Sequence, residues 1–311
     1  MERIRPGSAV SLAILLGIGT PLGACAGTLN GTVTDRGQPL AGAMVTVFSP
    51  DQKRRETVYA DAAGRYSLSV DFAGKLSVRA RAPYYKDATT EVDLPLIGSR
   101  RLDFAQERHS VAAELSESLP ASAHLTGLSF TSHDTRAAFI SQCNYCHQMG
   151  NALTRVPREE SQWRATVRRM EGYFAMLTNQ EAQDITRVLY KGFDGKPVAA
   201  VERTRWDPVQ APVKIKEWVA GDAATFIHDA DVGEDDDLYG ADEGHDLIWH
   251  LDRKTGKIAE YKIPDLGLPE GGVFAGVQLP IGVFSGQHGP HSLAQAKDGK
   301  FWITNALSSS L

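Results

Sequence analysis

Residues 31–50 read GTVTDRGQPLAGAMVTVFSP, and this stretch decides the fold of the first part of the chain. Apolar and polar residues alternate in Val45-Thr46-Val47, and the same alternation returns in Tyr66-Ser67-Leu68 and Leu76-Ser77-Val78. Glycines separate these runs at positions where short strands would turn. A period of two residues is typical of strands with one buried face. We therefore predict an all-β sandwich over residues 28–105.

The glycine and proline pattern of this segment carries a resemblance. Gly31–Ala43 (GTVTDRGQPLAGA), followed by Asp61–Leu68 (DAAGRYSL), resembles the carboxypeptidase regulatory-like, transthyretin-type module. Such modules are accessory domains, and the carboxylates of this segment have no histidine or cysteine beside them in sequence. The resemblance therefore implies a spacer or docking domain.

Residues 1–26 are typical of an export signal. Two arginines, Arg3 and Arg5, precede the apolar run Ala9–Ile18, and Leu22–Cys25 (LGAC) follows. LGAC resembles a bacterial lipoprotein box, which implies lipidation of Cys25. The alternative is ordinary signal peptidase cleavage after Ala26. Either outcome predicts an exported, periplasmic protein without a free thiol at Cys25. Lipidation of Cys25 would in addition attach the chain to the membrane.

Composition limits the partners. The chain has 311 residues, of which 42% are hydrophobic and 23% charged, and its net charge is −5. This balance indicates a folded protein with several domains and gives no reason to expect a nucleic-acid partner. After the N-terminus no run of 18 apolar residues occurs, so we expect no transmembrane helix.

A small helical domain is predicted over residues 134–195, between linkers at 106–133 and 196–212. Trp163, Val167 and Met170 recur at the spacing of one helix face, and Thr178 with Glu181 forms a capping box for a last helix. In the first linker we expect His109, His124 and His133 to be solvated.

The helical domain contains the motif Cys143-Asn144-Tyr145-Cys146-His147 (CNYCH). In C-x-x-C-H the two thiols bind covalently to the haem vinyl groups, and the histidine becomes a ligand of the iron. A zinc half-site would need a second pair of ligands nearby, and a thioredoxin-like redox pair would need a βαβ setting. The sequence offers neither, so it predicts one covalent haem c.

Residues Arg136–Gly195 resemble a small class I cytochrome c domain, through CNYCH and the W-x-x-x-V-x-x-M stretch that ends at Met170. The resemblance implies that this helix face packs on the haem and that Met170 is the sixth iron ligand. Met176 is the alternative, since it stands just before the last helix. Met149 is too close in sequence to His147 to reach the opposite haem face.

The last part of the chain, residues 213–311, repeats a β pattern. Lys214–Trp218 returns as Lys257–Tyr261, and His228–Asp242 aligns without gaps on His291–Asn305. The offsets of 43 and 63 residues locate an insertion at about residues 266–288. A unit of about 43 residues is typical of a β-propeller blade, so we predict about one and a half blades. Since a propeller needs several blades to close, we expect the chain to be a fragment of a longer protein.

The blade sequence LIWHLDRKTGKIAEY at residues 247–261 resembles streptogramin lyase-like (virginiamycin B lyase-like) propellers. His228 and His291 occupy equivalent places in the repeat. They either face the central channel as metal or substrate ligands, or are structural residues of the repeat. Glu234–Asp237 aligns on the turn Lys297–Lys300, which favours an exposed turn over a calcium site.

Two functions follow from these patterns. The first is an exported c-type cytochrome that passes single electrons to a redox partner protein and serves, in the complete protein, as the electron acceptor of a propeller-based dehydrogenase. The second is a lyase or hydrolase that acts on a small molecule at the propeller. The basic residues of the helical domain form a solvated face or a docking patch for an acidic partner. They are Arg155, Arg158, Arg164, Arg168 and Arg169.

Overall fold

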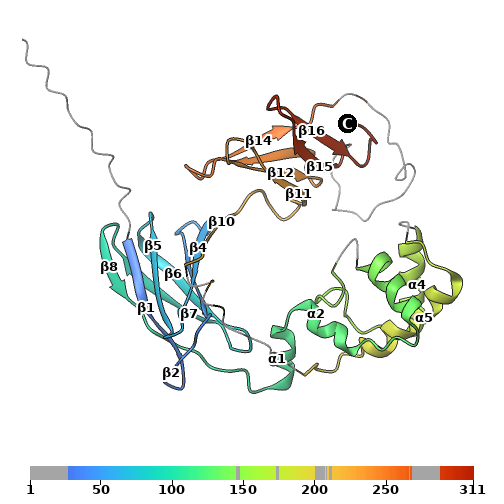
Figure 1. Cartoon of the computed structure of the whole chain (residues 1–311), viewed down its shortest axis with the longest axis horizontal. Helices are drawn as coiled ribbons and strands as arrows, with labels where there is room; N and C mark the ends of the chain where they lie inside the picture. The colour runs from blue at the N-terminus through green and yellow to red at the C-terminus, as the bar shows by residue number, and fades with distance from the viewer. Residues whose placement is uncertain are drawn as a thin grey trace, which may run out of the picture. The chain divides into compact units, whose positions relative to one another are not determined.

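The structure is a computed structural model. It describes residues 27–144, 148–172, 175–199, 207, 209, 212–265, 267 and 288–311 (Figure 1). The described residues fall into two compact units. The first holds those up to Val47 and from Thr57 to Lys214, and the second holds Phe48–Glu56 and those from Ile215 to Leu311.

The central strand of the first sheet is β1 (Gly27–Asp35), which pairs with four others. It runs antiparallel to β5 (Arg65–Val70) and, at its end, to β2 (Gln38–Pro39). It runs parallel to β8 (Gly98–Arg101) and then to β9 (Phe104–Ala105). Pairing along its whole length makes β1 the strand that this sheet is built around.

The second sheet contains β3 (Met44–Phe48), β6 (Gly74–Arg81) and β7 (Ala88–Leu94), paired antiparallel in that order. β4 (Arg54–Tyr59) lies beside β3, where the hydroxyls of Thr46 and Thr57 are 2.8 Å apart. Side chains of the two sheets form one core with Leu29, Val45, Val47, Leu68, Leu76 and Val78 almost fully buried. The predicted sandwich is confirmed, and its alternating residues are the ones that form the core.

The strand predicted at Lys214–Trp218 forms as β10. Its neighbour is β4, however, and not another strand of the C-terminal repeat. Within the second unit the Val219 N–H donates to the Lys53 carbonyl at 2.8 Å, and Arg55 forms a 2.7 Å ion pair with Glu217. The repeat predicted the strand correctly but could not identify its partner, because an edge strand pairs with whichever open edge lies within reach.

Helices occupy the chain from residue 112 to residue 192. They are α1 (Ala112–Ser118), α2 (Ala121–His124), η1 (Leu125–Gly127), α3 (His133–Ala138), the π-helical turn η2 (Phe139–Cys143), α4 (Glu160–Gly172) and α5 (Asn179–Gly192). The predicted capping box of α5 is present, with the Thr178 hydroxyl and the Glu181 carboxylate each accepting a backbone N–H. None of the described helices is both long and apolar enough to cross a membrane.

The structure differs from the linker predicted over residues 106–133. Three short helices form there, and Leu125 and Leu128 pack into the core of the helical region. His124, expected to be solvated, is only 4% exposed, whereas His133 is exposed as predicted. The sequence did not predict this burial. Helices of seven and four residues are too short to show a hydrophobic periodicity.

The C-terminal strands lie in the second unit. β11 (Ile227–Val232), β12 (Leu238–Asp242), β13 (Leu247–Leu251) and β14 (Ile258–Lys262) form a four-stranded antiparallel sheet in chain order. β15 (Pro290–Gln295) and β16 (Phe301–Asn305) form a hairpin. Most of the insertion predicted at residues 266–288 lies outside the described residues.

The two hairpins confirm the 63-residue repeat in detail. Ile227 faces Asp242 across β11 and β12, and Pro290 faces Asn305 across β15 and β16. Each register then shifts by one residue at the next position, so that His228 and His291 both stand at a bulge. Bulges of this kind redirect a side chain locally, and they are common beside functional sites.

Gly64 provides a test of the sandwich. Its φ is +70°, and a Cβ there would lie 2.5 Å from the Val33 carbonyl oxygen, so Gly64→Ala combines left-handed strain with a backbone clash. We expect a loss of about 2 kcal/mol or more in the free energy of opening β1 and β5. Gly37→Ala is the matched control, because Gly37 has φ +78° but open space around it. Hydrogen exchange of the full chain should show the larger loss only for Gly64→Ala, and equal losses would contradict this explanation.

Candidate functional site

The haem-type motif begins at the end of a helix. Cys143 is the last residue of η2, is half-buried, and packs against the apolar core of the helical region. Its partners Cys146 and His147 lie outside the described residues, as does Cys25. The described residues on either side are joined, since the Met149 N–H donates to the Asn144 side-chain oxygen at 3.0 Å. The described residues that flank the motif are thus held together by a hydrogen bond.

The predicted apolar face of α4 is buried. Trp163 is 1% exposed, Val167 is buried and Met170 is half-buried, so the W-x-x-x-V-x-x-M pattern does mark one packed side of the helix. The Trp163 ring lies 5.9 Å from the Phe193 ring, and the Arg158 guanidinium lies 4.5 Å from the Trp163 ring centroid. These contacts hold α4 against the end of α5.

The three candidate methionines have different surroundings. Met149 is buried in the helical core, Met170 is half-buried, and the Met176 side chain is 80% exposed. The Met176 N–H donates to the Gln142 side chain at 2.9 Å, which places this loop beside the residue that precedes Cys143. Met170 as sixth ligand, with Met176 as alternative, stays a prediction.

Haem carries two carboxylates, so a haem-binding domain should offer donors for them. The indole N–H of Trp163 is buried and has no hydrogen-bond partner in the described residues. A buried, unpaired donor is costly unless a ligand satisfies it. Together with the half-buried thiol of Cys143, this donor fits the chemistry of a covalently bound haem.

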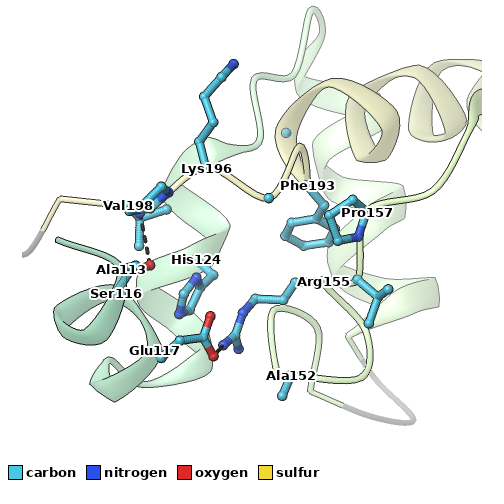
Figure 2. A pocket seen from close by; sticks show the side chains of 14 residues that line it. Ala113, Ser116, Glu117, His124, Ala152, Arg155, Pro157, Phe193, Lys196 and Val198 are labelled. Atoms are coloured by element: carbon cyan, nitrogen blue, oxygen red, sulfur yellow. Dashed lines mark hydrogen bonds and ion pairs between the residues drawn. The ribbon is translucent and has the colours of Figure 1, made fainter. Parts of the chain in front are cut away.

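A pocket of about 330 Å³ lies on the helical region, as Figure 2 shows. His124 and Phe193 line it, and Arg155 crosses it to form a 2.6 Å ion pair with Glu117. Burial, together with the nearby Arg155 guanidinium, lowers the pKa of His124, and its Nε2 has no partner in the described residues. The His124 imidazole is therefore a neutral, buried group that lines the pocket beside the Arg155–Glu117 ion pair.

Most of the arginines predicted as a basic face form ion pairs with glutamates of the same helical region. Arg155 is paired with Glu117, Arg164 with Glu160, and Arg168 with Glu171. Such pairs at the surface contribute little to stability but neutralise the charge around them. They favour the solvated face over the docking patch.

A second cluster lies in the C-terminal sheet and brings together the two repeat histidines. The rings of His228 and His291 are 3.7 Å apart between centroids, and the His228 Nδ1 lies 2.8 Å from the His291 carbonyl oxygen. The Glu243 carboxylate completes the cluster, in which one ligand atom from each residue lies within 4.8 Å of the others. Burial raises the pKa of Glu243 to about 7. Sequence reasoning identified the histidines and missed Glu243, because it stands outside the aligned repeat.

The residue before Glu243 holds its surroundings together through several hydrogen bonds, one of them with His245, whose Nδ1 lies 2.9 Å from the Asp242 carboxylate. Asp242 is fully buried, and its carboxylate accepts hydrogen bonds from the N–H groups of Phe226 and Gly244 and from the indole of Trp249. Burial would raise the pKa of Asp242, but these hydrogen bonds outweigh it and hold the pKa below its usual value. Asp242 thus joins the start of β11 to β12 and β13.

A further acidic group surrounds the turn predicted at Glu234–Asp237. The turn is present, closed by the Gly233 N–H on the Asp237 carbonyl at 2.9 Å. Asp235 accepts from the Tyr239 hydroxyl, and Asp237 lies 2.9 Å from the His250 Nε2. These carboxylates are engaged within the protein, in contrast to that of Glu243.

Comparison with known proteins identifies one part of the chain. Residues 28–107 match the family model of the carboxypeptidase regulatory-like domain, so the predicted N-terminal module is confirmed. This match spans less than half of the chain. No curated protein matches the sequence.

Solved structures give only distant likenesses. The minor pilin GBS52 of Streptococcus agalactiae is 14% identical, with 28% of this chain and 47% of that chain covered and a TM-score of 0.25. Hydroxyquinol 1,2-dioxygenase of Pseudomonas putida DLL-E4 is 13% identical, with 28% and 57% covered and a TM-score of 0.23. Catechol 1,2-dioxygenase of Acinetobacter sp. ADP1 is 14% identical, with 29% and 55% covered and a TM-score of 0.23. The chain thus spans about half the length of each, and likenesses this low carry no functional argument.

The Asp242 network gives a prediction for the C-terminal sheet. Asp242→Ala leaves three N–H donors without their acceptor, two of them buried, and removes the partner of His245. We therefore expect a loss of about 3 kcal/mol or more in the free energy of opening β12 and β13. Asp252→Ala is the control, since its carboxylate accepts backbone N–H groups in a turn that water can reach and should cost about 1 kcal/mol or less. Hydrogen exchange of the full chain measures both values. A loss for Asp242→Ala no larger than for Asp252→Ala would rule out the structural role.

Proposed function

We propose that this chain is an exported c-type cytochrome that transfers single electrons. The observation that carries the proposal is the CNYCH motif, with Cys143 placed at the end of η2 against the helical core. Cys143 and Cys146 would hold the haem through thioether bonds, with His147 as the proximal iron ligand and Met170 as the sixth. A bound haem would supply one-electron redox chemistry by cycling between ferric and ferrous iron.

The described residues around the motif support this proposal in three ways. The half-buried Cys143 thiol lies at the edge of an apolar core that can exclude water from one side of a macrocycle. The buried Trp163 N–H is a donor for a propionate. The hydrogen bond from the Met149 N–H to the Asn144 side chain joins the described residues on either side of the motif.

The surrounding parts fit an exported electron-transfer protein. The signal at residues 1–26 would take the chain to the periplasm, with a lipid anchor at Cys25. The four antiparallel strands β11–β14 have the arrangement of a β-propeller blade, and the β15–β16 hairpin repeats their first half. We propose that the C-terminal strands belong to a propeller and that this propeller holds the electron donor.

The sixth ligand can be identified by spectroscopy. We expect the full mature chain, expressed in the periplasm with haem-maturation machinery, to show a c-type spectrum with a methionine–iron charge-transfer band. Met170→Ala should abolish this band, because its thioether would be the sixth ligand. Met176→Ala is the control and should keep the band, since that side chain lies in water.

Three results would contradict parts of this proposal. Loss of the band only in Met176→Ala would move the ligand to the loop before α5. A band that survives in both variants would show that neither residue binds the iron. A wild-type protein with haem that no small redox mediator can reduce would contradict electron transfer itself.

A further inference from the structure

We propose that His228, Glu243 and His291 form a binding site for a divalent transition-metal ion of the zinc class. Two imidazole nitrogens and one carboxylate oxygen are a donor set that Zn²⁺ and its neighbours in the first row prefer. The site lies wholly in the second unit and uses none of the residues assigned to the haem. It therefore goes beyond the proposed cytochrome function and does not depend on it.

The backbone brings the two histidines together. His228 and His291 stand at equivalent bulges of the two hairpins, where each side chain leaves the regular alternation of its strand. The hairpins are joined beside them, since the Asp229 carboxylate accepts from the Ser292 hydroxyl at 2.6 Å and from the Leu293 N–H at 3.3 Å. The close approach of the rings thus follows from the hydrogen bonds that join the two hairpins.

The tautomer of His228 suits a ligand. Its Nδ1 lies 2.8 Å from the carbonyl oxygen of His291, so Nδ1 carries the proton and donates it there. Nε2 then presents a lone pair. A ligand histidine usually donates its second ring N–H to a carbonyl or carboxylate in this way, which fixes the orientation of the ring.

The Glu243 carboxylate has no internal role that would explain its burial. The residue is 2% exposed, and no described residue donates a hydrogen bond to its side chain. Asp242, one residue earlier, is equally buried but accepts hydrogen bonds from three neighbouring N–H groups. A carboxylate this little exposed, without a donor among the described residues, would be stabilised by a bound cation.

The dimensions of the cluster also fit. A tetrahedral ion about 2.1 Å from each ligand atom requires these atoms to lie about 3.4 Å apart. The candidate ligand atoms lie within 4.8 Å of one another. Side-chain rotations that move these atoms about 1 Å closer together would therefore give the tetrahedral spacing. Three protein ligands leave the fourth position of the ion open to water or to a small oxygen-donor ligand.

The test measures Zn²⁺ binding by the full mature chain carrying Cys143→Ser and Cys146→Ser, because thiols at the motif would otherwise bind zinc themselves. In competition with a chromophoric chelator we expect one Zn²⁺ per chain. Glu243→Gln, which preserves the shape of the side chain, should weaken binding at least about 100-fold. His250→Gln is the matched control from the neighbouring cluster, and it should change the affinity by less than about twofold.

Substituted Co²⁺ gives an independent signal. We expect visible bands of a tetrahedral nitrogen and oxygen site that disappear in His291→Asn. Hydrogen exchange must show β11–β16 folded in each variant. Equal Zn²⁺ affinity in the parent chain and in Glu243→Gln, or no binding by a folded parent chain, would overturn the proposal. Failure of the wild-type chain to acquire haem would contradict only the cytochrome proposal, because Zn²⁺ binding is measured in a chain without the motif thiols.

Discussion

The packing of α4 against α5 is the contact on which the helical region depends. Trp163 and Val167 of α4 share a core with Ile185 and Leu189 of α5, and all four side chains are buried. Phe139 of η2 belongs to the same core, and Cys143 packs on its edge. Helix packing therefore helps to set the position of the first motif thiol, together with the hydrogen bond from the Met176 N–H to Gln142 in the same turn.

The same packing leaves the Trp163 indole N–H buried without an acceptor. If Trp163 served packing alone, phenylalanine at this position would avoid the unpaired N–H and make the fold more stable. A ligand that carries carboxylates would accept a hydrogen bond from this N–H. Binding of the ligand would then stabilise the core. In that account the Trp163 indole N–H gains an acceptor only when the prosthetic group is attached.

Sequence patterns predicted some parts of the structure better than others. The alternation in β5 and β6 predicted the sandwich, because a period of two residues leaves a clear signal in strands with one buried face. The 63-residue repeat predicted two matching hairpins and placed His228 and His291 at equivalent positions. Hydrogen bonds between the two hairpins bring these positions together.

Other features had no local signal. The burial of His124 depends on helices too short to show periodicity, and the pairing of β10 with β4 joins residues far apart in the chain. Glu243 differs from the satisfied Asp242 only through its neighbours in space. The sequence shows which residue types could form a site. Whether a carboxylate has hydrogen-bond donors around it depends on residues that only the fold brings close.

Covalent haem is the central claim of this account, and intact mass tests it most directly. The full mature chain should be produced in the periplasm with haem-maturation machinery, denatured, and measured beside Cys143→Ser/Cys146→Ser. The account predicts that the wild-type chain keeps the mass of one haem after denaturation and that the double variant does not. A soluble wild-type chain without added mass, from cells that mature a control cytochrome, would contradict it.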